Sequence, residues 1–360
     1  MTQPKARQRV LSGMRPTGRL HLGNYMGALY NWVRLQDQYD CYFFIADIHA
    51  LTTDYANTGD IKGKSLQVAI DFLSAGLDPA RCVIFKQSDV KEHSELFNYL
   101  SMITPLGWLE RVPTYKDQQE QLREKDLNTF GFLGYPLLQS ADILLYKPDF
   151  VPVGQDQVAH VELTREIARR FNQLYSSAET PEVAAAFSDK ERMKAEISDN
   201  AIEADILPEP KVLLTPSPKL PGLDGRKMSK SYGNTIALSD PPDVVRKKLK
   251  TMITDPARVR RTDPGNPDLC PVGDLHKVFS EPETMAKVRE GCTTASIGCI
   301  ECKGWCADSV LREIEPIQIR RAQLEADLPY VEGILVDGAE RARTRAAETM
   351  KQVKRVLGLG

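Results

Sequence analysis

Residues 10–24 read VLSGMRPTGRLHLGN and decide how the first part of the chain folds. Residues 10–12 are an apolar run of strand type, and glycines and a proline then lead into a helical pattern over residues 26–33. His21 and Asn24 stand at the expected helix start, so both side chains can face one point near its N-terminus. Because that end of a helix is positively polarised, we expect polar side chains there to bind a phosphate.

A second motif, KMSKS, occupies residues 227–231 within a stretch rich in glycine, serine and asparagine, residues 222–234. This composition predicts a mobile loop. Lys227 and Lys230 would give it flexible ammonium groups that suit a pyrophosphate, and Gly23 in the first motif leaves room for a nucleotide to approach the backbone. Taken alone, each motif has an ordinary explanation, since a histidine at a helix start is usually a cap and a lysine is usually solvated.

Strand-type runs also occur at residues 42–45 and 83–85, and helical patterns lie between and after them at 66–73 and 96–103. Alternating strands and helices favour an α/β fold with a Rossmann-type parallel sheet and right-handed crossovers. Ligands of such sheets bind at the carboxyl ends of the strands. We therefore expect the motif that follows residues 10–12 to lie at the binding edge of the sheet.

The chain changes character after residue 238. Residues 239–242 read SDPP, a helix cap followed by prolines, and the remainder is helical in pattern. We predict a Rossmann-type catalytic domain over residues 1–238 and an all-helical domain over residues 239–360. Within the first domain, residues 176–204 are rich in Ala, Glu and Lys without an apolar face, which predicts an exposed helical insertion or a partly disordered excursion.

Composition sets broad limits on what the chain can be. Its 360 residues are 42% apolar and 27% charged, which is ordinary for a soluble globular protein. Residues 1–9 have no apolar segment of a signal peptide and no later run approaches a membrane span, so we expect a cytoplasmic protein. The net charge of −2 predicts no overall attraction to nucleic acid.

Any contact with RNA must therefore come from a local patch. One candidate patch in the helical part consists of Arg246, Lys247, Lys248, Lys250, Arg258, Arg260 and Arg261. On charge alone, a solvated helix face followed by a polar loop explains these residues equally well.

Five of the seven cysteines lie between residues 270 and 306. A cytosolic chain seldom holds cysteines as disulfides, so metal binding is the leading interpretation, with buried free thiols as the alternative. Four of them, Cys270, Cys292, Cys299 and Cys302, would supply the thiolates for a tetrahedral zinc ion or an iron–sulfur cluster. Their spacing does not separate the two, and Cys306 is a spare.

In this order, the two phosphate-binding motifs resemble the HIGH and KMSKS signatures of class I aminoacyl-tRNA synthetases. Within that class, the chain is similar to tryptophanyl-tRNA synthetases along nearly its whole length. The stretches that carry this similarity are 12–18 (SGMRPTG), 46–53 (ADIHALTT), 115–117 (YKD), 134–146 (GYPLLQSADILLY), 151–157 (VPVGQDQ) and 254–258 (TDPAR).

The resemblance implies an ATP-dependent ligase that attaches L-tryptophan to tRNA(Trp) through a tryptophanyl-adenylate and releases AMP and diphosphate. It also implies a homodimer that needs Mg²⁺, with a helical domain that reads the anticodon. Two other functions stay open: a tyrosyl-tRNA synthetase, which shares the sheet and both motifs, and a metal-dependent nucleic-acid-binding protein on a synthetase scaffold.

The resemblance assigns roles to individual residues. Catalytic roles fall to His21, Asn24, Lys116, Lys227 and Lys230. ATP contacts fall to Arg15, Pro16, Thr17, Gly23, Asn24, Gly154, Gln155 and Asp156, together with Lys227, Met228, Ser229, Lys230 and Ser231 of the lysine loop. Tryptophan is expected against Tyr135, Gln139, Asp142, Val151, Val153 and Gln157.

In the implied pocket, Asp142 accepts the indole N–H, while Tyr135 and Gln157 hold the α-amino end of tryptophan. A buried carboxylate facing an indole donor would reject phenylalanine because its own charge would be left unpaired. Discrimination of this kind can reach about 10⁴ to 10⁵. Gln139 stands where some relatives have methionine, so one wall of the pocket is expected to be more polar.

A subset of tryptophanyl-tRNA synthetases carries a four-iron, four-sulfur cluster near the anticodon-binding region, and the cysteines of this chain resemble that arrangement. The resemblance implies a cluster held by Cys270, Cys292, Cys299 and Cys302, with zinc as the alternative. This chain has one residue fewer between Cys270 and Cys292 than the pattern of that subset.

Overall fold

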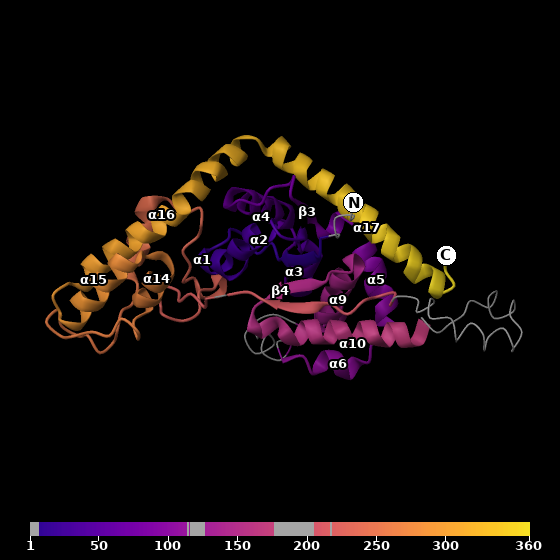
Figure 1. Ribbon diagram of the computed structural model, residues 1–360, viewed down its shortest axis with the longest axis horizontal. Coiled ribbons are helices and arrows are strands. Elements are labelled where there is room, and N and C mark those ends of the chain that lie inside the picture. Colours follow the sequence, from indigo (N-terminus) through magenta and orange to yellow (C-terminus); the bar gives the residue numbers. More distant parts are fainter. Residues whose placement is uncertain (1–6, 114, 116–126, 176–204, 217) are drawn as a thin grey trace, which may run out of the picture.

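The structure is a computed structural model that describes residues 7–113, 115, 127–175, 205–216 and 218–360. Its centre is a parallel five-stranded sheet in the order β3-β2-β1-β4-β5 (Figure 1). The strands are β1 (Arg9–Met14), β2 (Asp40–Ile45), β3 (Cys82–Lys86), β4 (Phe150–Val153) and β5 (Lys211–Leu214). The expected Rossmann-type parallel sheet is confirmed.

Helices flank this sheet and make up most of the rest of the described chain. Those of the first part are α1 (Leu22–Asn24), α2 (Tyr30–Leu35), α3 (Asp47–Asp54), α4 (Ile61–Ala75), α5 (Glu92–Ser101), α6 (Leu106–Glu110), α8 (Phe130–Leu133), α9 (Tyr135–Tyr146) and α10 (Val158–Tyr175). Those of the second part are α13 (Pro242–Thr251), α14 (Pro271–Phe279), α15 (Pro282–Thr293), α16 (Cys299–Ala326) and α17 (Leu328–Val356). The short elements are the π-helix η1 (Tyr25–Leu29) and the 3₁₀ turns η2 (Gln87–Asp89), η3 (Gln155–Gln157) and η4 (Lys230–Tyr232).

The sheet is buried on both faces because alternate residues of a strand point to opposite sides. Val10 and Phe43 belong to one apolar core, while their chain neighbours Leu11 and Phe44 belong to the other. Trp32 of α2 stacks on Phe43, with 4.8 Å between the ring centroids. The near-continuous apolar character of these strands follows from this double burial.

The two strands that the sequence did not predict are β4 and β5. Both are four residues long, and Pro152 interrupts the donor pattern of β4. They add to the sheet beside β1, whose other neighbour is β2. The chain order therefore reverses between β1 and β4, and the crevice at the carboxyl ends of these strands is the usual ligand site of such sheets.

Helices α16 and α17 form two arms of an arch that meet at Asp327 (Figure 1). The α16 arm starts beside α13, α14 and α15, and the α17 arm returns to the sheet and packs on β3. Gly338 of α17 lies so close to β3 that an added Cβ would stand 1.8 Å from the carbonyl oxygen of Ile84. The expected helical C-terminal region is confirmed, and its last helix packs on the edge strand β3 of the sheet. The boundary near residue 238 and the insertion at 176–204, which lies outside the described residues, stay predictions.

Candidate functional site

The first motif follows β1 and enters a short continuous helical segment over α1, η1 and α2. His21 caps the start of α1, because its Nδ1 accepts the backbone N–H of Asn24 at 3.3 Å. In return, Oδ1 of Asn24 accepts the backbone N–H of His21 at 3.2 Å. The ordinary explanation of this histidine as a cap is therefore correct, and the two side chains fold onto each other.

The capping bond fixes the chemistry of the imidazole. Since Nδ1 of His21 accepts a hydrogen bond, the ring proton of the neutral form resides on Nε2. Burial, aided by the charges of Lys230 and Lys227, lowers the pKa of His21 to about 4. At neutral pH the ring is thus an uncharged Nε2–H donor. The cap and a phosphate contact are compatible, because they use different nitrogens of the ring.

The lysine loop, residues 222–234, and the segment just after it pack directly against residues 20–23 of the first motif. Leu22 donates its backbone N–H to the carbonyl of Ile236 at 3.0 Å, and Leu238 donates to the carbonyl of Leu20 at 2.9 Å. A Cβ added at Gly23 would lie 3.0 Å from the ring of His21 and 3.6 Å from the Cβ of Met228. The missing side chain of Gly23 therefore lets the histidine and the loop approach each other.

Lys230 reaches from the loop to the turn before His21. Its Nζ donates to the carbonyl of Gly18 at 2.7 Å and to Oγ1 of Thr17 at 3.2 Å. Burial lowers the pKa of Lys230 to about 8. Lys227, which belongs to the same loop, is exposed to solvent. The two motifs, more than two hundred residues apart in sequence, thus converge at one place in the fold.

Asn234 holds the loop in this conformation and was not among the expected site residues. Its Oδ1 accepts the backbone N–H of Ser229 at 2.8 Å, and its Nδ2 donates to Oδ1 of Asp224 at 2.7 Å. Ser229 and Ser231 also share a hydrogen bond of 3.1 Å between their hydroxyls. An asparagine in a glycine- and serine-rich stretch is a common turn residue, so the sequence alone gave no reason to single it out.

The expected tryptophan-binding residues of α9 lie on one face of that helix. Tyr135, Gln139 and Asp142 are spaced i, i+4 and i+7, which places them in line. Tyr135 and Asp142 are buried, and Gln139 is half-buried. Val151 is buried on β4, and Val153 ends that strand half-buried. The structure thus aligns Tyr135, Gln139 and Asp142 along one face of α9.

Asp142 is completely buried and accepts hydrogen bonds from three side chains. Its Oδ1 accepts from Gln87 at 2.7 Å and from Nδ1 of His93 at 2.6 Å, and its Oδ2 lies 2.9 Å from Nε2 of His49. Burial opposes ionisation of the carboxyl, yet the charge of His93 and the hydrogen bonds of His49 and His93 outweigh it and hold its pKa below the usual value. Tyr146 extends the network, with its hydroxyl 2.9 Å from Nε2 of His93.

This network corrects one expectation from the sequence. A phenylalanine in the pocket would not leave the charge of Asp142 unpaired, because His49, Gln87 and His93 already stabilise it. An ionised carboxylate has about four acceptor positions, so an indole N–H would be a fourth donor. The free-energy penalty for binding phenylalanine is therefore smaller than it would be if the indole N–H were the only partner of a buried charge. His49 belongs to residues 46–53, one of the stretches that resemble the family, whereas no sequence motif around Gln87 or His93 marked them as site residues.

The remaining expected contacts surround the carboxyl ends of β1 and β4. Arg15 and Thr17 are exposed and Pro16 is buried in the turn after β1. Gly154 and Gln155 follow β4, with Gln155 exposed, and Gln157 is half-buried at the end of η3. Lys116 and the side chain of Asp156 lie outside the described residues. The structure thus brings the segments 15–24, 154–157 and 227–231 to the same edge of the sheet.

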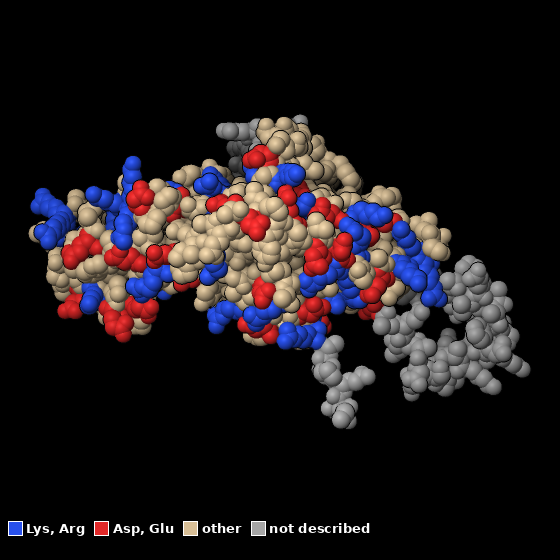
Figure 2. All heavy atoms as spheres, turned by 90° about the horizontal axis from the view of Figure 1, so that it is seen from above, with Lys and Arg blue, Asp and Glu red and all other residues tan. Residues whose placement is uncertain are grey.

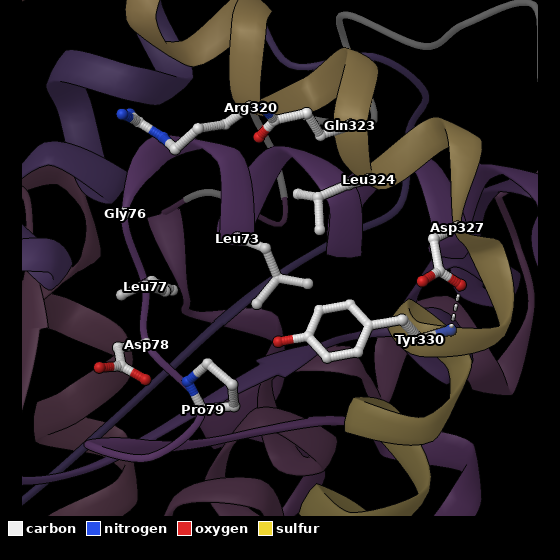
Figure 3. Close-up of a pocket in the computed structure, with 10 residues that line it drawn as sticks. All are labelled: Leu73, Gly76, Leu77, Asp78, Pro79, Arg320, Gln323, Leu324, Asp327 and Tyr330. Atoms are coloured by element: carbon white, nitrogen blue, oxygen red, sulfur yellow. Dashed lines mark hydrogen bonds between the residues drawn. The ribbon is translucent and has the colours of Figure 1, made fainter.

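A cavity of about 440 Å³ opens elsewhere, under the elbow of the arch (Figure 3). Its walls come from the end of α4 and from both arms, and include Leu73, Arg320 and Tyr330. The ring of Tyr330 points across the cavity toward Leu73 in this view. None of the expected site residues lines it. The cavity is therefore separate from the edge of the sheet where the motifs converge.

The four cysteines expected as ligands come from neighbouring helix ends. Cys270 precedes α14, Cys292 lies near the end of α15, and Cys299 and Cys302 begin α16. Burial raises the pKa of Cys302 to about 12, and the nearby thiols of Cys270, Cys292 and Cys299 add to this shift. In the described part of the chain, however, no group of three or more His, Cys, Asp or Glu side chains is arranged to hold a metal ion. The described thiols thus form no ready-made site for a single zinc ion.

The candidate basic patch is only partly available for RNA. Arg258 is buried and donates to the carbonyls of Arg261 and Ile297 at 3.0 and 2.6 Å. Lys248 and Arg246 are engaged in ion pairs with Asp240 and Asp308. The exposed cations that are left are Lys247, Lys250, Arg260 and Arg261. Figure 2 shows cations and anions mixed at both ends of this face of the molecule.

None of the described helices is both long enough and apolar enough to cross a bilayer.

Comparison with known proteins shows the family to which the chain belongs. A family model described as tRNA synthetases class I (W and Y) matches residues 3–312. A tryptophan–tRNA ligase from Ralstonia nicotianae is 51% identical, and 98% of each chain is covered. One from Thermotoga maritima is 48% identical and covers 98% of this chain and 99% of its own.

Among solved structures, the tryptophanyl-tRNA synthetase of Campylobacter jejuni complexed with ADP and tryptophan is similar, with a TM-score of 0.81 at 31% identity. The match covers 98% of this chain and 100% of that one. Together with the converging motifs, these relatives show that the chain belongs to the class I tRNA synthetases for tryptophan and tyrosine, and within them to the tryptophan–tRNA ligases.

Proposed function

We propose that this enzyme activates L-tryptophan with ATP and transfers it to tRNA(Trp). In the first step, the carboxylate of tryptophan attacks the α-phosphorus of ATP, the bond to diphosphate breaks, and tryptophanyl-adenylate forms. In the second, a hydroxyl at the 3′ end of the tRNA takes the tryptophanyl group and AMP leaves. The attacking carboxylate is already ionised, so the protein supplies positioning and charge stabilisation and no general base.

The observation that carries this proposal is the contact of Lys230 with the turn before His21. Nζ of Lys230 lies 2.7 Å from the carbonyl of Gly18, and the Nε2–H of His21 belongs to the next turn of the chain. A triphosphate placed between them would meet an ammonium on one side and a neutral N–H donor on the other. Mg²⁺ would arrive with ATP, because the phosphates and water supply most of its ligands.

We assign recognition of the indole N–H to Asp142 on α9. Support comes from its complete burial, its depressed pKa and its position on the same helix face as Tyr135 and Gln139. His49, Gln87 and His93 orient the carboxylate, so its ionised oxygens are already aligned before the ring arrives. Preorganisation of this kind lowers the free-energy cost of binding.

Aminoacylation of tRNA(Trp) with a panel of aromatic amino acids tests the proposal. We expect charging with tryptophan and ATP–diphosphate exchange that depends on tryptophan. Tyrosine as the preferred substrate would favour the tyrosine enzyme, and absence of exchange with every amino acid would favour a nucleic-acid-binding protein on a synthetase scaffold. Both alternatives have weaker support, because relatives up to 51% identical are named tryptophan–tRNA ligases.

For the helical part, we propose anticodon recognition with an iron–sulfur cluster as a structural element. Support comes from the four thiols at neighbouring helix ends and from the exposed cations near them. A cluster of four irons holds its ligand sulfurs farther apart than one zinc ion does, so it needs less closely spaced thiols than a single zinc ion. The guanidinium of Arg258 lies 3.9 Å from Sγ of Cys292, where it would offset thiolate charge.

Anaerobic purification, absorbance spectroscopy and metal analysis test the cluster. We expect a coloured protein with iron and sulfide, and loss of iron in Cys302→Ser. Cys306→Ser is the matched control on the same helix, because Cys306 is fully buried and its burial raises the pKa of the thiol, so it is expected to stay protonated and leave the iron content unchanged. A colourless protein with one zinc ion per chain would contradict the assignment.

We also propose that the chain works as a homodimer in the cytoplasm. Three large apolar side chains support a covered surface, since Met102 at the end of α5, Leu106 of α6 and Phe130 of α8 are 74%, 60% and 65% exposed. Large apolar side chains exposed to this extent favour a protein interface.

A further inference from the structure

Asp71 is a completely buried carboxylate that belongs to neither nucleotide motif. It lies on α4, and its Oδ2 accepts the backbone N–H of Leu20 at 2.9 Å. Leu20 directly precedes His21, so this hydrogen bond fixes the position of the backbone immediately before His21. A buried carboxylate needs further donors, because an unpaired charge in the interior is strongly unfavourable.

The second partner of Asp71 comes from the C-terminal part of the chain. Arg321 of α16 is 3% exposed and donates through Nη1 to Oδ1 of Asp71, 250 residues away in sequence. Nη2 of Arg321 is held by Gln67 on α4 and by Glu325, the latter at 3.0 Å. One carboxylate therefore joins the first motif to a helix of the C-terminal region.

The same face of α16 holds the neighbouring segments. Gln318 donates to the carbonyls of Leu238 and Asp240 at 3.0 and 2.8 Å, just after the lysine loop. Glu313 accepts a hydrogen bond of 2.6 Å from the hydroxyl of Tyr25, just after the first motif. In Figure 1, α16 passes beside α4 at this point. The helix thus contacts both sides of the junction between the two motifs.

We propose that Asp71 and Arg321 are positioning residues for adenylate formation, through which α16 sets the place of Leu20 and His21 relative to Lys230. The proposal rests on the proposed function. A misplacement of about 1 Å in a positioned group can lower a rate by about 100-fold. The charge of Asp71 also acts on Lys230, since it opposes the lowering of that lysine's pKa by burial.

Tryptophan-dependent ATP–diphosphate exchange in the full-length enzyme tests this role. In the double variant Asp71→Leu/Arg321→Met, apolar side chains of similar volume replace the buried pair, an exchange that often preserves stability. We expect near wild-type thermal stability and an unchanged KM for tryptophan, with kcat/KM for ATP lowered by about 10- to 100-fold. Asp71→Asn keeps an acceptor for Leu20 and is expected to retain most of this activity.

Arg312→Met is the matched control, because Arg312 lies on the same helix and pairs with Glu281 away from both motifs, so wild-type kinetics are expected. Wild-type ATP kinetics in a folded double variant would overturn the proposal, as would equal changes for ATP and tryptophan together with a lower melting temperature. If the double variant does not fold, Arg321→Lys provides the test, because lysine keeps the positive charge but cannot form the forked contact of the guanidinium. Unchanged ATP kinetics in Arg321→Lys would then overturn the proposal. Absence of exchange in the wild-type enzyme would contradict the proposed function instead.

Discussion

His21 and Lys230 have different charge states at neutral pH, although both lie at the junction of the two motifs. Burial lowers both pKa values, to about 4 for His21 and to about 8 for Lys230. The imidazole is therefore neutral and the ammonium is still charged at pH 7. In the proposed complex, the charge that faces the triphosphate would come from Lys230, and His21 would contribute a neutral donor.

The pH dependence of ATP use should follow Lys230. Since kcat/KM reports ionisation in the free enzyme, we expect kcat/KM for ATP to fall by about tenfold per pH unit above pH 8, where the ammonium loses its proton. Lys230→Arg keeps its charge throughout this range and should flatten the decline. Lys230→Ala should lower exchange at every pH with little change in tryptophan affinity. A profile of Lys230→Arg identical to that of the wild type would remove this lysine from the titration.

Substitution of His93 tests the proposed role of Asp142 in binding the indole. Nδ1 of His93 lies 2.6 Å from Oδ1 of Asp142, and its Nε2 lies 2.9 Å from the hydroxyl of Tyr146. We expect His93→Leu to raise KM for tryptophan by about one to two orders of magnitude, because a hydrogen bond to a charged group contributes about 1.5–3 kcal/mol.

His93→Asn keeps a donor near the position of Nδ1 and should recover most of this loss. KM for ATP serves as the internal control and should stay constant in both variants. An equal rise in KM for both substrates would indicate general damage to the fold and would contradict a specific role of His93.

Helix α17 is the last helix of the chain and packs directly on strand β3 of the sheet. Its close approach to β3 is possible because Gly338 has no side chain against the carbonyl of Ile84. Arg341 and Arg343 of the same helix donate to the carbonyls of Pro79 and Asp89 at the two ends of β3. The edge of the sheet at β3 is thereby covered by a helix, which protects its unpaired backbone groups.

Two glycines of α17 give a matched pair of substitutions. Gly338→Ala should lower the free energy of unfolding by about 1–3 kcal/mol or more, because its methyl group would meet the backbone of β3. Gly333 faces open space, so Gly333→Ala should raise the free energy of unfolding by up to about 1 kcal/mol through helix propensity alone. Urea unfolding measures both. Effects of the same sign in the two variants would disprove the close packing of α17 on β3.

Helix α16 contacts α4 near the place where the two motifs meet, and α17 packs on β3 of the sheet. The two arms of the arch therefore connect these two regions of the molecule. In the proposed homodimer, a second copy would cover Met102, Leu106 and Phe130. Light scattering should give twice the mass of one chain for the wild type.

Met102→Glu/Leu106→Glu should shift that mass toward the monomer, because buried charges in an interface are strongly unfavourable. Leu359→Glu is the control, since Leu359 is also 60% exposed but lies at the C-terminal end of the chain. A monomeric wild-type protein would contradict the homodimer, and a dimeric double variant would place the interface elsewhere.

The sequence by itself determined the parallel sheet, the helical C-terminal region and the two phosphate-binding motifs. These features depend on local patterns: apolar runs for buried strands, helical periodicity, and short motifs flanked by glycine and proline. It also identified Asp142 and the four cysteines through their resemblance to a family. Strands β4 and β5 escaped prediction because four residues with nearby prolines carry too little pattern.

Only the tertiary structure decided the partners of these residues. The three donors around Asp142 and the ion pair between Asp71 and Arg321 depend on which elements meet in space. These partners lie 49 to 250 residues apart and leave no local signature in a single sequence. The physical reason is that a buried charge selects its donors by distance in the folded chain and by burial, and both arise only when the helices have packed.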